Sequence, residues 1–275
     1  QAGQYLGDGW LSQTLLKLTE TRISFKNTFK IASMNVFAAN LLPVGQAGAL
    51  ATAFYFYKKL GVTNQNFIFL SICWTLVTTI TLAIVFLFSL IGLPEIPHLG
   101  FNFKNLIFLF ILMIALIALA SLISRTIVWP RVRPIVAKSN FYKEVLLFKK
   151  NFPNHKEAIF KNKSLVLQAF VAALIFYLSN ILTLTLSCLT FGIFPNLYVI
   201  AFAYSIALVA GWITLAPAGL GATEATMLLI FLQFNIPPAQ AVASILLFRI
   251  MSFWIPIPVG VLAYLSLKSQ FKKSR

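Results

Sequence analysis

Two residues of opposite charge stand inside apolar segments in the last quarter of the sequence. Glu224 lies 12 residues before Ile236, and Arg249 lies 12 residues after Pro237. At a rise of ~1.5 Å per residue, helices on either side of this turn place both side chains ~18 Å from it, near the middle of a bilayer. An unpaired charge at that depth costs at least ~2.5 kcal/mol. The spacing therefore predicts that the carboxylate and the guanidinium face one another on adjacent antiparallel helices.

This pair is open to two interpretations. A guanidinium can bind two phosphate oxygens at once, so Arg249 could hold a lipid phosphate that Glu224 orients or releases. Alternatively, the pair only fixes a helix hairpin against the last membrane span. No P-loop, HExxH or GxSxG motif is present, and a single aspartate, Asp8, offers little material for paired-carboxylate chemistry. Cys73 and Cys188 are isolated in apolar stretches, and we expect neither a metal nor a cofactor.

Breaks rich in proline and glycine interrupt the apolar sequence at two places, the second just before Glu224. Their proline and glycine residues are Pro43, Gly45, Gly48, Pro217, Gly219 and Gly221. Glycines leave backbone N–H groups exposed at the start of a half-helix, which favours an anion. Close packing of small residues between helices is the other interpretation. We predict that these six residues, with Glu224 and Arg249, form a lipid headgroup site, and at the first break both interpretations stay open.

The elements that must position these residues are predicted to be membrane helices. Of the 275 residues 59% are hydrophobic and 10% are charged, whereas soluble domains have ~25% charged residues. Several stretches exceed the ~20 apolar residues needed to cross a bilayer. The sequence therefore predicts an all-α integral membrane protein, a polytopic helical bundle that forms one transmembrane domain over residues 1–275. The expected spans are 66–93, 105–128, 165–191 and 238–267, and the mixed stretch 11–30 is expected to be an interfacial helix.

The positive charge of the chain follows its predicted topology. The net charge is +16, but basic residues lie mainly in loops and tails between apolar spans, which argues against nucleic-acid binding. The basic segment 130–164 is predicted to be cytoplasmic and to lie partly along the membrane surface. Lys58, Lys59 and the tail 268–275 are placed on the same side. We therefore predict a multi-pass protein of the plasma (inner) membrane with a cytoplasmic C-terminus.

The surroundings of the two breaks repeat at a constant offset of 174 residues, which aligns Pro43 with Pro217. A short apolar helix and then a long span follow each break. Charge placement makes the span 66–93 run outward and its counterpart 238–267 run inward. This pattern predicts two inverted repeats, each containing a re-entrant helix hairpin broken by proline and glycine. The repeats cover residues about 23–128 and about 165–267.

Three stretches around the ion pair resemble a known family. They are Gly211-Trp-Ile-Thr-Leu-Ala-Pro217-Ala-Gly-Leu-Gly-Ala-Thr-Glu224-Ala, Phe234-Asn-Ile-Pro-Pro-Ala-Gln-Ala and Leu246-Leu-Phe-Arg249-Ile-Met-Ser-Phe-Trp254. They are similar to the flippase-like membrane domain of the lysylphosphatidylglycerol synthase/flippase family, and the similarity extends from about Ile23 to Leu267. The segment from Asn40 to Gly48 resembles the family's first motif. It departs where family members often carry an acidic residue and an arginine, because Ala49 and Thr52 stand there.

The resemblance implies a domain that moves a phospholipid or a polyprenyl-linked lipid between leaflets, and it matches the second motif at Glu224 and Arg249. We therefore predict a lipid translocase rather than an enzyme, with a headgroup site at the membrane midplane. Its expected partners are membrane lipids with an anionic or phosphate-bearing headgroup. A membrane-embedded transferase acting on a glycosyl lipid carrier is one alternative. A non-catalytic partner subunit of a lipid or glycan synthase is another, which the departures at Ala49 and Thr52 favour.

Overall fold

The computed structural model describes residues 1–41, 46–93, 140–214 and 219–272, and its regular elements within these ranges are helices. The chain divides into a larger unit, Gln1–Pro94 with His155–Arg275, and a smaller unit, Glu95–Asn154. Helix α7 (Asn140–Lys161) begins in the smaller unit and shows that part of the predicted basic segment is helical. The predicted span 105–128 lies outside the described residues, as do Pro43, Gly45 and Pro217.

Three helical stretches in the described ranges are long and apolar enough to cross a membrane. They are α4 (Asn64–Ile91), α8 (Lys163–Thr190) and the continuous stretch Pro238–Lys272. The hydroxyl of Thr63 caps the start of α4 by accepting a hydrogen bond from the N–H of Asn66, at 3.2 Å. Each stretch corresponds to a predicted span, with ends that differ by a few residues.

The third stretch contains a wide turn directly after Arg249. It consists of α11 (Pro238–Arg249), the π-helical segment η3 (Ile250–Trp254) and α12 (Pro256–Lys272). The N–H of Ile255 donates to the carbonyl of Ile250 at 3.0 Å, five residues back rather than four. Pro256 has no N–H to continue an α-helical ladder, which favours an irregular turn at this point.

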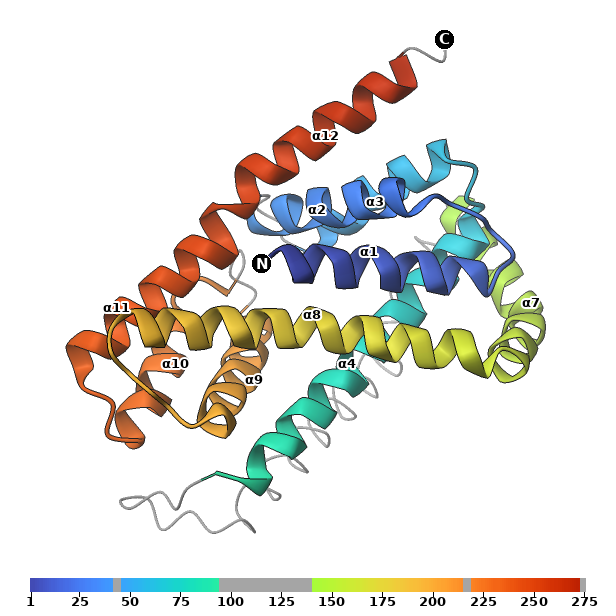
Figure 1. The fold of residues 1–275 in the computed structure, drawn as a ribbon. Coiled ribbons are helices and arrows are strands. Elements are labelled where there is room, and N and C mark those ends of the chain that lie inside the picture. Colours follow the sequence, from blue (N-terminus) through green and yellow to red (C-terminus); the bar gives the residue numbers. More distant parts are fainter. Residues whose placement is uncertain (42–45, 94–139, 215–218, 273–275) are drawn as a thin grey trace, which may run out of the picture. The chain divides into compact units, whose positions relative to one another are not determined.

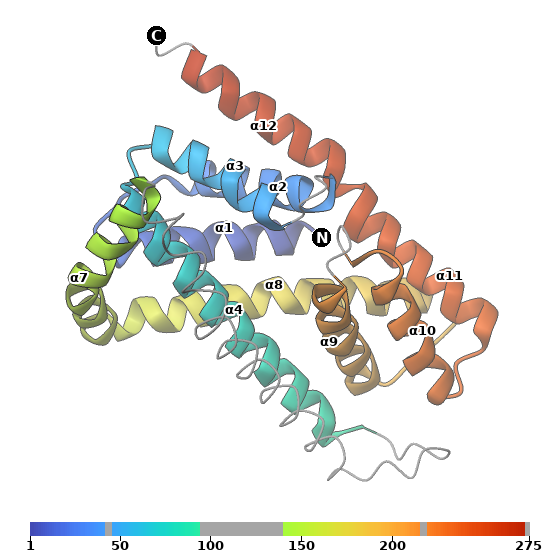
Figure 2. The same ribbon diagram turned by 180° about the vertical axis from the view of Figure 1, so that it is seen from behind.

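The shorter helices of the larger unit form two neighbouring pairs. Helix α2 packs against α3, and α9 packs against α10, while α2 also lies along α12 (Figures 1 and 2). Both proline- and glycine-rich breaks therefore lie between helices that are in contact. The bounds are Phe25–Leu41 for α2, Gln46–Lys59 for α3, Leu197–Ile213 for α9 and Ala222–Gln233 for α10.

Helix α1 (Ala2–Lys17) lies lengthwise against α8 and runs antiparallel to it (Figure 1). The N-terminal amino group is 3.5 Å from the hydroxyl oxygen of Thr183. A methyl group at Gly7 would lie 2.7 Å from the carbonyl oxygen of Ala172 and 2.8 Å from the backbone nitrogen of Phe176. The two backbones therefore touch directly, which only a residue without a side chain permits.

This arrangement shows that the predicted interfacial helix over residues 11–30 is wrong. Helix α1 ends at Lys17, and Glu20 adopts a positive φ of 57° before α2 begins at Phe25. The hydroxyl of Thr19 donates to the carbonyl of Leu16 at 2.8 Å, a local bond that helps to end the helix. Glu20 and Arg22 thus lie in the turn between two packed helices, while the lysines of this stretch belong to the helices themselves.

One end of the larger unit is rich in basic residues. Lys58 and Lys59 close α3 shortly before α4 begins, and the ammonium group of Lys59 lies 5.7 Å from the ring of Phe271 near the end of α12. The side-chain amide of Asn66 donates to the hydroxyl of Thr21 at 2.9 Å, which brings the α1–α2 turn to the same place. We call this the basic end.

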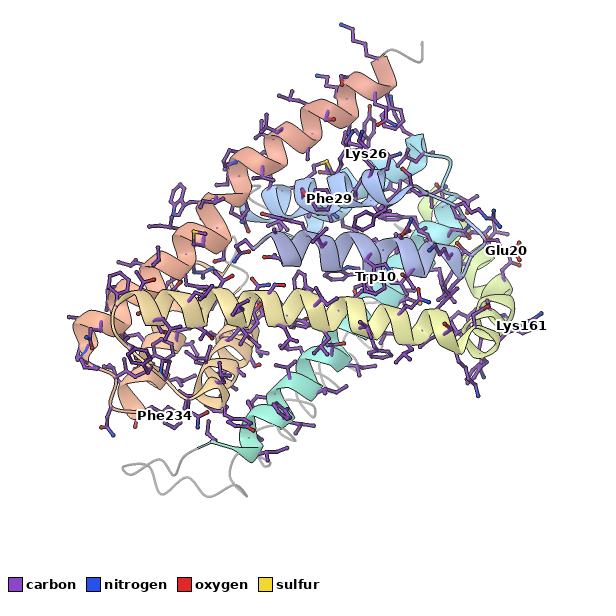
Figure 3. All side chains as sticks on the ribbon, viewed as in Figure 1. Trp10, Glu20, Lys26, Phe29, Lys161 and Phe234 are labelled. Carbon is purple, nitrogen blue, oxygen red and sulfur yellow. The ribbon has the colours of Figure 1, made fainter. Side chains whose placement is uncertain are left out.

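The opposite end carries no basic residue in its two described loops. The side-chain amide of Asn196 donates to the carbonyl of Gly92 at 3.3 Å, and that of Gln240 donates to the carbonyl of Phe191 at 3.2 Å. Residues 191–197 and 234–240 contain neither lysine nor arginine. Figure 3 shows the labelled Glu20 and Lys161 at one end and Phe234 at the other. Consequently α4 runs away from the basic end, and the stretch from α11 to α12 runs toward it.

Candidate functional site

The structure brings Glu224 and Arg249 together. The Nε atom of Arg249 lies 2.6 Å from Oε1 of Glu224, and the side chains are 12% and 25% exposed, respectively. Helices α10 and α11 are antiparallel neighbours because a tight turn joins them, in which Asn235 adopts a φ of 57° and the N–H of Ile236 donates to the carbonyl of Phe231. The pairing predicted from the sequence spacing is confirmed.

The start of α10 fixes the carboxylate from its other side. Glu224 is the third residue of the helix, and its Oε2 accepts a hydrogen bond from the N–H of Gly221 at 2.8 Å. The partial positive charge at a helix N-terminus stabilises a carboxylate there. One oxygen of Glu224 therefore faces a guanidinium and the other faces the backbone. The N–H of Gly221, which the sequence interpretation left exposed for an anion, here donates a hydrogen bond to Glu224.

Two glycines allow the chain to turn into α10. Gly221 has a φ of 85° and Gly219 a φ of 64°, a region that residues with side chains rarely adopt. A methyl group at Gly219 would lie 2.7 Å from the Cα atom of Gly211 on α9. The hydroxyl of Thr223 donates to the carbonyl of Gly219 at 3.0 Å and closes the turn. These residues hold the N-terminus of α10 against α9.

Gly48 is the described member of the first break. It is buried in the first turn of α3, where its carbonyl accepts a hydrogen bond from the hydroxyl of Thr52 at 2.7 Å. The structure thus gives a local role to Thr52, which occupies a position where the resembling family often has an arginine. Whether Gly48 takes part in a headgroup site stays a prediction.

A hollow of about 140 Å³ lies beside the carboxylate, between α10 and α11. Glu224 is the charged residue among its apolar lining residues, which are Ala225, Leu228, Val242, Ile245 and Leu246. The lining surface is apolar, so carbon atoms of Glu224 rather than its carboxylate oxygens border the hollow. Its volume is below the ~300 Å³ of a small ligand pocket and offers room for a short piece of hydrocarbon.

Sequence reasoning missed Tyr204, which lies on the protein-facing side of the ion pair. This α9 residue is buried, its ring centroid is 6.3 Å from that of Phe248, and it lies within electrostatic reach of Arg249. Its position in the hydrophobic stretch 197–213 gave no signal, because a tyrosine in an apolar helix usually only fills space.

Sequence reasoning considered Asp8 only as material for paired-carboxylate chemistry and gave it no other role. It is buried in the larger unit, and its Oδ1 accepts a hydrogen bond from the indole Nε1–H of Trp74 at 2.7 Å. The available signal was the spacing of Gly3 and Gly7, since small residues four apart mark the face of a helix that packs closely in a membrane.

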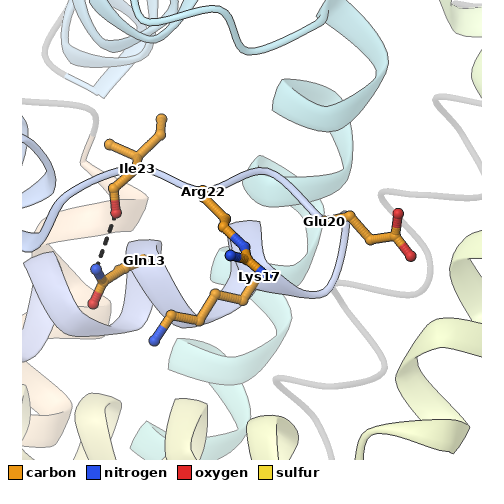
Figure 4. Close-up of a pocket in the computed structure, with 5 residues that line it drawn as sticks. All are labelled: Gln13, Lys17, Glu20, Arg22 and Ile23. Carbon is orange, nitrogen blue, oxygen red and sulfur yellow. Dashed lines mark hydrogen bonds between the residues drawn. The ribbon is translucent and has the colours of Figure 1, made fainter.

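A larger pocket of about 720 Å³ opens at the basic end (Figure 4). Lys17, Glu20 and Arg22 are its charged lining residues, and the side chain of Glu20 points away from the two cations (Figure 4). The side-chain amide of Gln13 donates to the carbonyl of Ile23 at 3.0 Å and ties the turn to α1. The pocket therefore has two cationic residues and one acidic residue in its lining.

Together these features define a multi-pass α-helical membrane protein with an ion pair held between two of its helices. The chain belongs to the family described as lysylphosphatidylglycerol synthase TM region, whose profile matches residues 4–260. The matched range includes most of α1 with Asp8. The resemblance noted from the sequence began near residue 23 and did not include them.

Relatives in archaea and bacteria agree with this assignment. A UPF0104 membrane protein of Methanocaldococcus jannaschii is 28% identical over 95% of this chain and 80% of its own length. Another UPF0104 membrane protein, from Methanothermobacter thermautotrophicus, is 27% identical over 41% of this chain and 33% of its own length. The inner membrane protein YbhN of Escherichia coli is 27% identical over 45% of this chain and 40% of its own length.

Proposed function

We propose that this protein is a lipid translocase that moves a phospholipid or a polyprenyl-linked lipid between leaflets. The observation that carries the proposal is the 2.6 Å contact between Glu224 and Arg249 beside an apolar hollow. Ionisable residues within membrane spans are costly, and they commonly mark substrate pathways. A pair that borders a groove for hydrocarbon is suited to a lipid whose headgroup carries phosphate.

In this proposal the headgroup phosphate competes with Glu224 for Arg249. Guanidinium and phosphate form short, charge-assisted and often bidentate hydrogen bonds. Glu224 keeps its hydrogen bond from Gly221 when it releases Arg249, so its negative charge is not left without a donor. The contact between Glu224 and Arg249 is thus the resting state. A lipid phosphate breaks this contact, and the contact forms again after the lipid leaves.

We further infer that the pairs α2–α3 and α9–α10 are the re-entrant hairpins of two inverted repeats. In support, the first pair begins and ends near the basic end, and the second begins and ends near the opposite end. The side-chain amide of Asn40, at the end of α2, is 3.4 Å from the carbonyl of Phe253 in the π-helical segment. Two hairpins that approach one broken span from opposite sides fit an alternating-access cycle.

The basic end is proposed to face the cytoplasm of the plasma (inner) membrane, which places the C-terminus there as well. Lys17 and Arg22 in the larger pocket would attract anionic headgroups from that leaflet. The lipid is therefore proposed to carry a net negative headgroup.

The test is lipid exchange in proteoliposomes of phosphatidylcholine and phosphatidylglycerol that contain fluorescently labelled phosphatidylglycerol. Dithionite added outside bleaches label as it reaches the outer leaflet. We expect Arg249→Ala to slow bleaching at least about tenfold, equivalent to about 1.4 kcal/mol, and Lys268→Ala on the same stretch to have no effect. A folded Arg249→Ala protein that exchanges lipid at the wild-type rate would remove Arg249 from the mechanism. Mass spectrometry of the vesicle lipids would reveal a covalently altered lipid if the protein were a transferase.

A further inference from the structure

The larger unit holds a second acidic residue in its interior, Asp8 on α1. Its side chain lies close to mid-level of two candidate spans. Neighbouring Gly7 touches α8 at Phe176, which is 13 residues from the start of that helix and 14 from its end. Trp74, the hydrogen-bond donor to Asp8, is within about 5 Å of the centre of α4 along the axis, at ~1.5 Å per residue.

The groups that the structure describes around Asp8 are neutral rather than cationic. Trp74 on α4 donates to the carboxylate, while Tyr57 on α3 and Tyr177 on α8 lie within its electrostatic reach. Helix α2 brings Phe29 against the neighbouring Gly9. Within the described residues no lysine or arginine forms an ion pair with Asp8. An ionised carboxylate in such surroundings lacks the compensation that Arg249 gives to Glu224.

A purely structural role would not require an acid at this position. The hydrogen bond from Trp74 would pin α1 to α4 equally well if the acceptor were the amide oxygen of an asparagine. A carboxyl group differs in that it can take up a proton, become neutral and still accept that bond. The distinguishing property of Asp8 is therefore its ability to change charge inside the membrane.

A row of buried aromatic residues leads from Tyr177, within electrostatic reach of Asp8, toward the ion pair. The ring centroids of Tyr177 and Tyr204 are 6.5 Å apart, and those of Tyr204 and Phe248 are 6.3 Å apart. Phe248 immediately precedes Arg249, and Tyr204 lies within electrostatic reach of both Tyr177 and Arg249. Charges interact more strongly in a protein interior than in water, so a change of charge at one site shifts the charge balance at the other.

We propose that Asp8 is a proton-binding site coupled to the Glu224–Arg249 pair through Tyr177 and Tyr204, and that lipid and proton move together. This inference rests on the proposed translocase function. With Asp8 protonated, the charges of Asp8, Glu224 and Arg249 sum to zero without lipid. They sum to −1 when one phosphate of charge −1 is bound. With Asp8 ionised, the bound state would carry −2. Binding of an anionic headgroup therefore favours uptake of a proton, and an acidic donor side drives lipid movement.

The first test compares lipid exchange in proteoliposomes with and without a pH gradient, using labelled phosphatidylglycerol as the probe. We expect acid on the side of the labelled leaflet to speed the movement of labelled lipid severalfold in the wild type. In Asp8→Asn, which keeps an acceptor for the hydrogen bond from Trp74, the ratio of the rates with and without the gradient should fall to unity. Trp74→Phe is the matched control, since it removes the hydrogen bond but keeps the carboxyl and should keep the ratio. A wild type without acceleration, or an Asp8→Asn protein that retains it, would overturn the proposal.

The second test does not depend on lipid movement and separates this inference from the proposed function. Infrared difference spectra between acidic and alkaline buffer detect the carbonyl band of a protonated carboxyl. We expect a titrating band that is missing in Asp8→Asn and whose titration is displaced in Arg249→Gln. A protein that moves no lipid but shows both effects would refute the translocase and retain the coupled proton site. If Asp8→Asn leaves every titrating band in place, Asp8 binds no proton and the inference fails.

Discussion

Neutralising both partners of the Glu224–Arg249 pair should destabilise the protein by less than the sum of the two single neutralisations. Breaking a buried ion pair typically costs ~3–5 kcal/mol, because one charge is left without compensation. The contact distance of 2.6 Å favours the upper part of that range, and the side-chain exposures of 12% and 25% lower it. We expect a loss of ~2–4 kcal/mol for Arg249→Gln. Glu224→Gln should cost a similar amount, although its amide oxygen can still accept from Gly221.

The double variant Glu224→Gln/Arg249→Gln leaves no charge behind, and its two amides can bond to one another. Its loss should therefore fall short of the sum of the single losses by ~2 kcal/mol. The free energy of unfolding can be measured by titration with a denaturing detergent in mixed micelles. Lys268→Gln at the basic end is the control and should change the free energy of unfolding by less than ~0.5 kcal/mol. An interaction energy within ~0.5 kcal/mol of zero would contradict the reasoning.

The same variants separate the two interpretations of the pair. If the pair serves only to hold α10 against α11, the double variant should exchange lipid as fast as the wild type once each rate is divided by the amount of folded protein. If Arg249 binds a phosphate, the double variant should be as slow as Arg249→Gln. Comparing stability and exchange in one set of proteins thus distinguishes a structural contact from a binding group.

Three further predictions concern the surroundings of the site. Gly7→Leu should force α1 away from Ala172, lower the free energy of unfolding by ~1–3 kcal/mol in the same detergent titration, and do so more than Leu6→Ala on the exposed side of α1. Lys17→Gln/Arg22→Gln should weaken binding of vesicles rich in phosphatidylglycerol by about tenfold at low salt and hardly at all at high salt, as a flotation assay would show. In a variant without its own cysteines, a cysteine at Ser269 should react with an impermeant maleimide only in inside-out vesicles; labelling of right-side-out vesicles would place the basic end outside.

The candidate ion pair could be predicted from sequence because geometry left few options. A short turn at residues 235–237 makes two helices antiparallel, and equal spacing on either side then brings Glu224 and Arg249 to one level. The cost of a lone charge in hydrocarbon supplied the reason for pairing. Long apolar runs likewise predicted α4 and α8, since any crossing helix needs about the same length.

The position of α1 could not be predicted in the same way. The contacts between apolar helices depend on the shapes of their surfaces. The hydropathy of a sequence carries little information about those shapes. Gly3 and Gly7 carried that information, but a mixed composition from residue 11 onward suggested a helix at the membrane interface instead. Since α1 was misplaced, the partnership of Asp8 with Trp74 was missed as well.

The π-helical turn after Arg249 has a consequence for how this span tolerates insertions and deletions. A π-helical turn accommodates one residue more than an α-helical turn, so losing one residue between Ile250 and Trp254 would restore an ordinary helix. In a regular α-helix, a deletion rotates everything beyond it by roughly 100°, but here the residue removed is the extra one that the wide turn holds. The face of α12 that packs on α2 would therefore keep nearly the same direction relative to Arg249. The span can thus lose one residue at this turn without separating α12 from α2, whereas a deletion within α11 or α12 would turn that face away.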